Sequence, residues 1–123
     1  MIAGRVTESR EAVIDLEVVG QNQRKVRVEA AIDTGFNGYL TLPKATVNSL
    51  ALQPAGNRIA TLGDGNTVIL EVYLAAVIWN DQEREVLALQ AEGGALVGMS
   101  LLYGNRVTIT VLDGGDITIE PIQ

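Results

Sequence analysis

Apolar and polar residues alternate with a period of two along most of this chain of 123 residues. In residues 25–32, the apolar set Val26, Val28, Ala30 and Ile32 falls on one face, and charged residues occupy much of the other. Successive side chains of a strand point to opposite faces, so this pattern predicts a half-buried strand. Similar alternation predicts further strands at residues 14–18, 106–111 and 117–120.

Clusters of Gly, Asn, Asp and Gln separate these segments, as is typical of turns. They lie at residues 20–23, 63–66, 80–82 and 113–116. The Asp-Gly step at 64–65 is a strong hairpin signal. Because no linker or low-complexity segment divides the chain, we predict one all-β domain over residues 1–123, folded as a closed or strongly curled barrel.

Helical signals are confined to two short segments. Pro43 suits the first position of a helix that reaches Leu50, with Val47 and Leu50 buried. Residues 99–103 form the second candidate, which Gly104 would end. Both are about two turns or less, so only tertiary packing could hold them.

Composition narrows the functional classes. Hydrophobic residues make up 47% of the chain, which excludes a disordered segment. The net charge is −6 and basic residues form no patch, so we expect neither nucleic acid nor a membrane surface as partner. Residues 1–10 show no signal peptide and the apolar run 72–79 is too short to span a bilayer, so a cytoplasmic location is expected.

The chain contains no Cys and no His. Nucleophilic sites of the Ser-His-Asp and Cys-His kinds are therefore excluded within it. Zinc sites built from Cys and His are excluded as well. Any hydrolytic chemistry must use carboxylates, Lys, Tyr, Ser or Thr.

A carboxylate stands where the strand 25–32 ends, in the triplet Asp33-Thr34-Gly35. A charge beside an apolar strand is costly unless it is hydrogen-bonded or functional. Gly35 permits a close backbone approach and Thr34 adds a hydroxyl that can donate and accept. Taken alone, the triplet is equally consistent with a solvated turn, because Asp and Gly are ordinary turn residues.

Three segments together resemble the retropepsin-like aspartic proteases, the single-lobed relatives of pepsin. Ala-Ile-Asp-Thr-Gly at 31–35 resembles their active-site signature, and Ala-Leu-Val-Gly-Met-Ser-Leu-Leu at 95–102 resembles their later apolar-apolar-Gly segment and short helix. Residues 61–67 lie where the family has its glycine-tipped flap hairpin. Order and approximate spacing match over residues 26–111, and the Asp-Thr-Gly-Phe form is similar to a bacterial and archaeal branch.

The resemblance implies a retropepsin-like barrel and an aspartic endopeptidase with Asp33 as a catalytic residue. That chemistry needs two carboxyl groups that share one proton and hold a water between them. At about 3 Å and an effective dielectric near 20, two carboxylates repel by roughly 5 kcal/mol, so one stays protonated near neutral pH. No metal or cofactor is needed.

Only one Asp-Thr-Gly occurs in the chain. None of the other aspartates follows an apolar strand and precedes Thr-Gly or Ser-Gly: Asp15, Asp64, Asp81, Asp113 and Asp116. The second carboxylate must therefore be Asp33 of another copy, brought close by a two-fold axis. The resemblance implies the same homodimer, with a peptide or protein substrate bound at the interface.

Other roles follow from the resemblance alone. Thr34 would hold the two active-site loops together across the axis, and Gly35 would offer its backbone to the substrate. Gly98 would pack beneath the Asp33 loop. Gly63, Asp64 and Gly65 would form the flap tip, unless they are an ordinary hairpin turn. Candidate pocket walls, each more typical of a core when considered singly, are Phe36, Leu62, Leu96 and Val97.

Some residues depart from the family pattern. Asn37 and Met99 stand where many retropepsins have an Asp and an Arg that form an ion pair near the interface. The family often dimerises through terminal strands, for which residues 117–123 could serve, with 1–6 as a weak partner and Pro121 limiting the ladder. Two alternatives remain open: a non-catalytic peptide-binding or dimerisation module on the same fold, and an unrelated small barrel with a structural turn.

Overall fold

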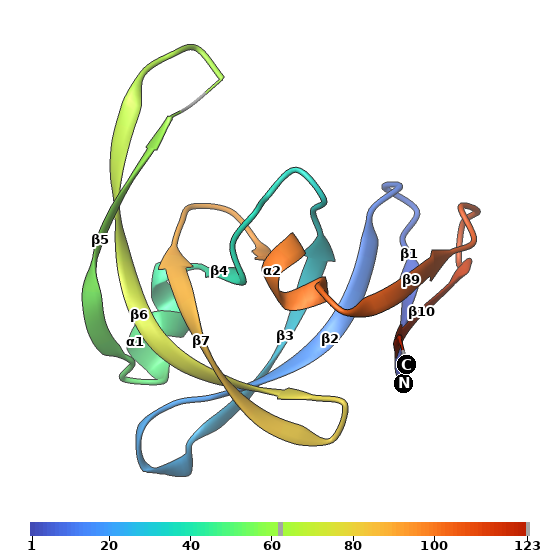
Figure 1. The fold of residues 1–123 in the computed structure, drawn as a ribbon, viewed down its shortest axis with the longest axis horizontal. Coiled ribbons are helices and arrows are strands. Elements are labelled where there is room, and N and C mark those ends of the chain that lie inside the picture. Colours follow the sequence, from blue (N-terminus) through green and yellow to red (C-terminus); the bar gives the residue numbers. More distant parts are fainter. Residues whose placement is uncertain (62, 123) are drawn as a thin grey trace.

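The computed structural model describes residues 1–61 and 63–122, which form a ten-stranded sheet with two short α-helices (Figure 1). The strands are β1 (Ile2–Val6), β2 (Ala12–Val19), β3 (Lys25–Ile32), β4 (Leu40–Leu42), β5 (Gln53–Thr61), β6 (Thr67–Trp79), β7 (Gln82–Gln90), β8 (Ala95–Val97), β9 (Asn105–Ile109) and β10 (Asp116–Pro121). The helices are the 3-10 turn η1 (Gln21–Gln23), α1 (Lys44–Ser49) and α2 (Met99–Leu102).

Six of the strands close into a barrel. Neighbours in the sheet follow the order β5-β6-β7-β4-β8-β3-β2-β1-β10-β9, and an additional pairing joins β2 to β6. In that pairing Val18 lies opposite Val77 and Val19 opposite Ala76. The circuit β6-β7-β4-β8-β3-β2 is therefore closed, which confirms the predicted all-β barrel with one or two short helices.

Two parallel pairings set the geometry of the barrel. β3 runs parallel to β8, and β4 runs parallel to β7. Ile32 at the end of β3 lies opposite Val97 at the end of β8. Since both strands end at the same level of the sheet, the residues that follow them, Asp33 and Gly98, emerge side by side.

Alternation predicts the core correctly where a strand has both neighbours. Ile14, Leu16 and Val18 on β2 are buried, as expected from the sequence. In helix α1, Val47 is buried and Leu50 follows at its C-cap, also buried. Pro43 occupies the N-cap rather than the first helical position.

The predicted strand over residues 106–111 is wrong at its end. β9 stops at Ile109, and Val111 is 75% exposed. The chain turns there, because the N–H of Leu112 donates to the Thr110 carbonyl and the N–H of Gly115 donates to the Leu112 carbonyl. Alternation alone could not reveal this end, since a tight turn can begin at residues that still alternate.

The two terminal strands, β1 and β10, both pair within the sheet of their own chain. β1 lies between β2 and β10, and Gly4 permits this approach because a Cβ there would stand 2.2 Å from the Val13 carbonyl oxygen. β10 pairs with β1 on one side and β9 on the other. The expectation that residues 117–123 offer a free strand to a second copy is therefore wrong for β10. In the described sheet, the end strands are β5 and β9.

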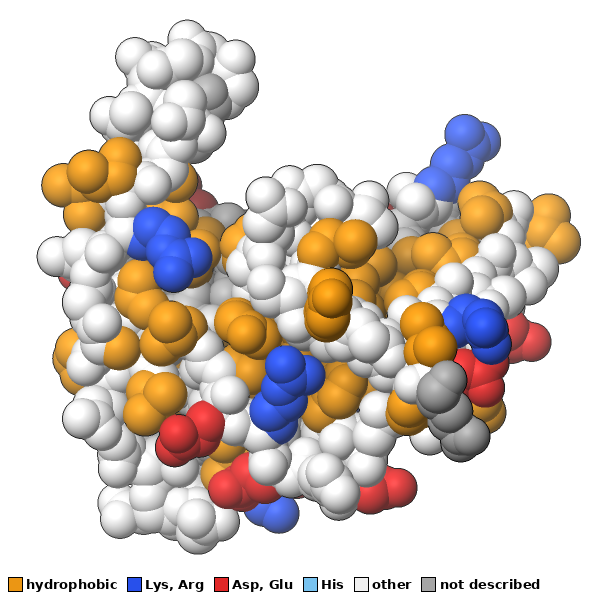
Figure 2. Space-filling model, viewed as in Figure 1, with side chains coloured by type: hydrophobic (Ala, Val, Ile, Leu, Met, Phe, Trp, Pro, Cys, Tyr) orange, Lys and Arg blue, Asp and Glu red, His pale blue; other side chains and the backbone are white. Residues whose placement is uncertain are grey.

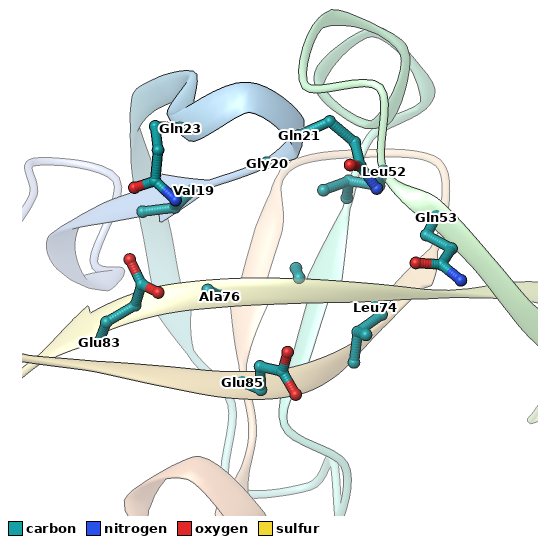
Figure 3. Close-up of a pocket in the computed structure, with 11 residues that line it drawn as sticks. Val19, Gly20, Gln21, Gln23, Leu52, Gln53, Leu74, Ala76, Glu83 and Glu85 are labelled. Atoms are coloured by element: carbon teal, nitrogen blue, oxygen red, sulfur yellow. The ribbon is translucent and has the colours of Figure 1, made fainter.

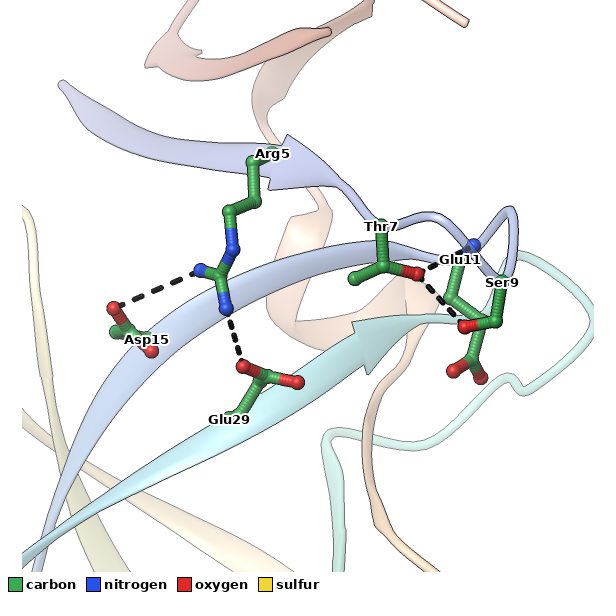
Figure 4. Close-up of polar contacts among 6 residues, drawn as sticks. All are labelled: Arg5, Thr7, Ser9, Glu11, Asp15 and Glu29. Atoms are coloured by element: carbon green, nitrogen blue, oxygen red, sulfur yellow. Dashed lines mark hydrogen bonds and ion pairs between the residues drawn. The ribbon is translucent and has the colours of Figure 1, made fainter. Parts of the chain in front are cut away.

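Polar side chains form contacts on the exposed side of β1, β2 and β3 (Figure 4). Arg5 on β1 forms ion pairs with Asp15 on β2 and Glu29 on β3. The Thr7 hydroxyl accepts from the backbone N–H of Glu11 in the turn that follows β1. Exposed ion pairs contribute little stability, so the register here depends mainly on the buried face. No helix among the described residues is long and apolar enough to cross a membrane.

If β10 is a structural strand of the monomer, Ile119→Ala will destabilise the chain strongly. Ile119 is 0% exposed, and truncation of a buried Ile to Ala costs about 2–5 kcal/mol. The matched control is Ile122→Ala, at a side chain 58% exposed, which should change stability by about 0.5 kcal/mol or less. Urea denaturation measures both, and equal small effects would contradict the packing of β10.

Candidate active site

The Asp33 turn is hydrogen-bonded to the end of β8. The backbone N–H of Asp33 donates to the Val97 carbonyl at 2.9 Å, which extends the parallel pairing by one residue. The N–H of Phe36 donates to the Asp33 carbonyl at 3.2 Å and closes the turn. The N–H of Gly35 donates to Asp33 Oδ1 at 2.9 Å. This bond orients the half-buried carboxylate.

A second set of bonds ties the rest of the loop to α2. The N–H of Met99 donates to the Phe36 carbonyl at 2.8 Å, and the N–H of Ser100 donates to the Gly38 carbonyl at 3.1 Å. The Ser100 hydroxyl donates to the Asn37 carbonyl. Three consecutive loop carbonyls are therefore held by the first turn of one helix. Asn37 and Met99, the two residues that stand in place of an Asp–Arg ion pair in this sequence, both take part in these hydrogen bonds through their backbone groups.

Gly98 and Gly38 make room for the ring of Phe36. A Cβ on Gly98 would stand 2.2 Å from the Gly38 carbonyl oxygen and 2.5 Å from Phe36 Cδ2. A Cβ on Gly38 would stand 2.5 Å from Phe36 Cζ. The aromatic side chain thus fills the space beneath the Asp33 loop, and only glycine fits at either neighbouring position.

Asp33 opens into a cleft of about 470 Å³. Its other lining residues are Val6, Arg10, Glu11, Ala12, Ala31, Ile32, Leu96, Ile109 and Val111. A second cleft of about 450 Å³ includes the exposed Thr34 together with Met99, Tyr103 and Val107. Both clefts share Ile32 and Ile109, so the Asp33 turn stands between two adjoining hollows, of which the one beside Thr34 is mostly apolar.

The predicted flap is a long hairpin, formed by β5 and β6, that projects from the barrel (Figure 1). Its turn is fixed by Asp64 Oδ1, which accepts from the N–H of Asn66, and by Gly65 with φ +88°. Ala60 and Val68 on the hairpin line a cavity of about 840 Å³ that also includes Pro43 and Ala91. In Figure 1 the hairpin tip stands well apart from the loop after β3.

The structure therefore brings together Asp33, Thr34, Gly35 and Gly98, and leaves Gly63, Asp64 and Gly65 exposed at a distance. Of the candidate pocket walls, Val97 is fully buried in the core, and Leu96 is half-buried and lines the Asp33 cleft. Phe36 packs under the loop. Leu62 lies outside the described residues.

Sequence reasoning missed the residues that support the site from elsewhere in the chain. Ser100 belongs to the later motif, and its place two residues after Gly98 is the only sequence signal of its contact with the loop. Val107 and Ile109 line the clefts from β9, which pairs with β10 and not with any strand of the barrel. No local pattern could place them beside Thr34.

A separate cavity of about 270 Å³ lies near η1, β5, β6 and β7 (Figure 3). Polar side chains, among them Gln21, Gln53, Glu83 and Glu85, surround it. Asp33 does not line this cavity. In the part of the chain that the structure describes, no three His, Cys, Asp or Glu residues group as a metal site would require.

Comparisons with solved structures identify the architecture. The chain is similar to a retropepsin-like aspartic protease from Rickettsia conorii, with a TM-score of 0.61 and 16% identity over 99% of this chain and 91% of that one. It is similar to the simian foamy virus (mac) protease, at TM-score 0.51 and 17% identity over 72% and 90% of the two chains. The chain is also similar to the EIAV protease in an inhibitor complex. That likeness has a TM-score of 0.55 and 15% identity, over 77% of this chain and 88% of that one.

No protein-family profile and no curated protein sequence matches the chain. The structural likeness nevertheless agrees with the features described above. A closed six-stranded barrel with a projecting hairpin and an Asp-Thr-Gly turn defines the class of single-lobed acid-protease folds. The chain has the retropepsin-like fold, as its sequence motifs predict.

Gly98→Ala should destabilise the chain by about 1–3 kcal/mol, because the added Cβ must displace the Gly38 carbonyl or the Phe36 ring. Gly94→Ala is the matched control, since a Cβ there meets nothing within 4 Å. Both variants are compared by chemical denaturation. Equal stability of the two variants would show that the loop does not rest on residue 98 as described.

Proposed function

We propose that this protein is an aspartic endopeptidase, in which Asp33 of one copy and Asp33 of the partner subunit activate a water molecule. The observation that supports this most directly is the Asp33 turn. Its carboxylate is oriented by the Gly35 N–H, faces an open cleft and rests on a loop held by Val97 and by α2. An ordinary solvated turn needs no such support.

The proposed reaction divides its steps between the two carboxyl groups. The ionised carboxylate takes a proton from the water as the water oxygen attacks the carbonyl carbon of the peptide. The protonated carboxyl gives its proton to the carbonyl oxygen, which yields a tetrahedral diol. One hydroxyl proton then returns to a carboxylate while the other carboxyl protonates the amine nitrogen, and the C–N bond breaks. No external reactant besides water is consumed.

A single chain holds half of this arrangement. Glu11 is the other acidic residue of the Asp33 cleft, and it is an exposed residue of the turn between β1 and β2. It has neither a glycine N–H that orients its carboxylate nor a buried strand pairing beneath it in the described contacts. A two-fold axis beside Asp33 supplies an identical carboxylate in a symmetric setting, which is the simpler source of the second group.

The substrate we propose is an extended peptide. Such a peptide would lie between the flap hairpin and the barrel and pair its backbone with strand edges. The cavity of about 840 Å³ beneath the hairpin, lined by Val68, Leu70 and Ala91, suits an apolar side chain of that peptide. Glu71 and Glu92 stand at the same cavity beside Lys44, so the net negative charge of the three would disfavour an acidic side chain there.

Asp33→Asn should abolish peptide cleavage, because an amide cannot serve as the general base. A peptide library incubated from acidic to neutral pH, with products identified by mass spectrometry, measures this. Glu11→Gln is the matched control and should retain activity. Peptide binding by a wild type that never cuts would instead identify a non-catalytic peptide-binding or dimerisation module on the same fold, and cleavage that survives Asp33→Asn would exclude Asp33.

Mixing the wild type with Asp33→Asn tests whether the two carboxylates come from two copies. After subunit exchange at saturating concentration, an equal mixture holds about one quarter wild-type dimers, so activity should fall to about a quarter of that of wild type at the same total concentration. A site complete within one chain would give about one half. Sedimentation of each protein and of the mixture verifies that the assemblies form.

A further inference from the structure

The cleft that contains Asp33 has one basic side chain among its described lining residues, that of Arg10. Arg10 is exposed and belongs to the turn between β1 and β2. The ion pairs found in the described part of the chain involve Arg5 and Lys25 and do not include Arg10. A guanidinium group carries several hydrogen-bond donors in a rigid plane that matches a carboxylate. Arg10 therefore offers the cleft a position for an anionic group of a ligand.

The turn that presents Arg10 gives this residue an unusual backbone conformation. The N–H of Arg10 donates to the Thr7 carbonyl at 2.9 Å, and the N–H of Thr7 donates to the Glu11 carbonyl at 2.8 Å. Arg10 has φ +67°, a left-handed conformation that glycine adopts at lower cost than arginine. The stability of the turn thus favours glycine at this position, and the fold does not account for an arginine there.

A second turn, between β9 and β10, holds the first turn in place. The N–H of Val6 donates to the Gly115 carbonyl, and the N–H of Gly114 donates to the Val6 carbonyl, both at 2.9 Å. We call residues 7–11 and 110–115 the paired turns. Because backbone hydrogen bonds join them, the paired turns form one wall of the Asp33 cleft and hold the backbone of Arg10 at a fixed place in it.

The second of the paired turns adds apolar surface to this wall. Val111 lines the same cleft and is 75% exposed, and the adjacent Leu112 is 69% exposed. Ile109, the last residue of β9, lines the cleft as well. Figure 2 shows hydrophobic side chains gathered at this end of the molecule, with a basic side chain projecting beside them. A cation next to an apolar wall suits a side chain with an aliphatic stem and an anionic end.

Glu11 carries the opposite charge at the same cleft, but strand alternation directs it to another face. Glu11 directly precedes β2, so it falls on the same face as Asp15, which pairs with Arg5 on the exposed side of the sheet (Figure 4). Ala12 falls on the opposite face and packs against the core. Arg10 is therefore the charged group of the paired turns that is available to a ligand in the cleft.

We propose that Arg10 is a specificity-determining residue, which selects substrates with a glutamate side chain next to the bond that is cut. This inference rests on the proposed function and names the substrate class of the same site. A side chain that flanks the scissile bond must lie close to Asp33, and the cleft is the hollow that Asp33 lines. The glutamate stem would lie along Ile109 and Val111, and its carboxylate would accept hydrogen bonds from the Arg10 guanidinium. Aspartate, one methylene shorter, would hold its charge closer to Asp33 and be repelled more strongly.

Matched peptides test this preference at about pH 6, where a glutamate side chain is ionised. A peptide that the wild type cleaves is made with glutamate, glutamine, aspartate or lysine at each position next to the scissile bond. At one of these positions kcat/KM should be about fivefold or more higher for glutamate than for glutamine, and lowest for lysine. High salt should reduce the advantage, because ions screen an exposed charge pair.

The same peptides with a free or an amidated C-terminus distinguish two sources of the carboxylate. If Arg10 binds a side chain, the preference for glutamate should be the same in both sets. If only peptides with a free C-terminus near the scissile bond were favoured, whatever their side chains, Arg10 would bind the chain end, and the assignment to glutamate would be overturned.

Substitutions of Arg10 test whether this residue causes the preference. Arg10→Glu should reverse it, so that the lysine peptide is cleaved better than the glutamate peptide. Arg10→Gly should bring the ratio of glutamate to glutamine close to one without lowering stability in urea, because glycine tolerates φ +67°. The matched control is Arg27→Gln, which removes a positive charge from an exposed position of β3 outside the cleft and should leave the ratio unchanged within about twofold. A ratio that survives Arg10→Gly would overturn the inference.

Binding measurements separate this inference from the proposed function. Fluorescence anisotropy compares the affinity of Asp33→Asn, with and without Arg10→Gln, for labelled library peptides that differ only in glutamate or glutamine. A glutamate preference that depends on Arg10, in a protein whose wild type cleaves nothing, would support the role of Arg10 and reject the endopeptidase. Cleavage by the wild type with no glutamate preference would do the reverse.

Sedimentation of Arg10→Gln excludes a different role for this residue. The dissociation constant of the dimer should match that of the wild type, because the proposed partner of Arg10 is the substrate. A raised dissociation constant together with an unchanged glutamate preference would show that Arg10 is a contact between copies, which would overturn the inference.

Discussion

The site depends on one constraint, the parallel pairing of β3 with β8. Parallel strands end together, so Ile32 and Val97 carry the segments after them to the same place. The turn that holds Asp33 and the glycine that begins α2 then meet at van der Waals distance. Because parallel pairing requires a long crossover, the whole of β4 to β7 is the connection that makes this meeting feasible. The barrel is the scaffold for that single junction.

Support for the Asp33 loop comes from packing and backbone bonds more than from charge. The Phe36 ring fills the space left by two glycines, and α2 holds the carbonyls of residues 36–38. Such contacts do not weaken with salt, whereas an exposed ion pair in the same place would. The loop can therefore be rigid in a single copy. Rigidity matters here because catalysis by positioned groups tolerates only small displacements.

The two terminal strands complete the sheet of a single chain. β1 and β10 pair inside each chain, and Ile117 and Ile119 are buried in its own core. A chain built this way completes its main sheet before it meets a partner. The edges left unpaired in the described sheet are those of its end strands, β5 and β9.

Local sequence determined β2, β3, β10 and most of β9, the two helices, the turns and the position of Asp33, since side-chain alternation and turn chemistry act between neighbours. The burial of Leu16 and the helix after Pro43 could be predicted in this way. Only the tertiary structure decided that the strand after Asn105 ends at Ile109, that β10 is covered on both sides, and that Ser100 holds the Asn37 carbonyl. These features arise from contacts between segments distant along the chain, which no local periodicity encodes.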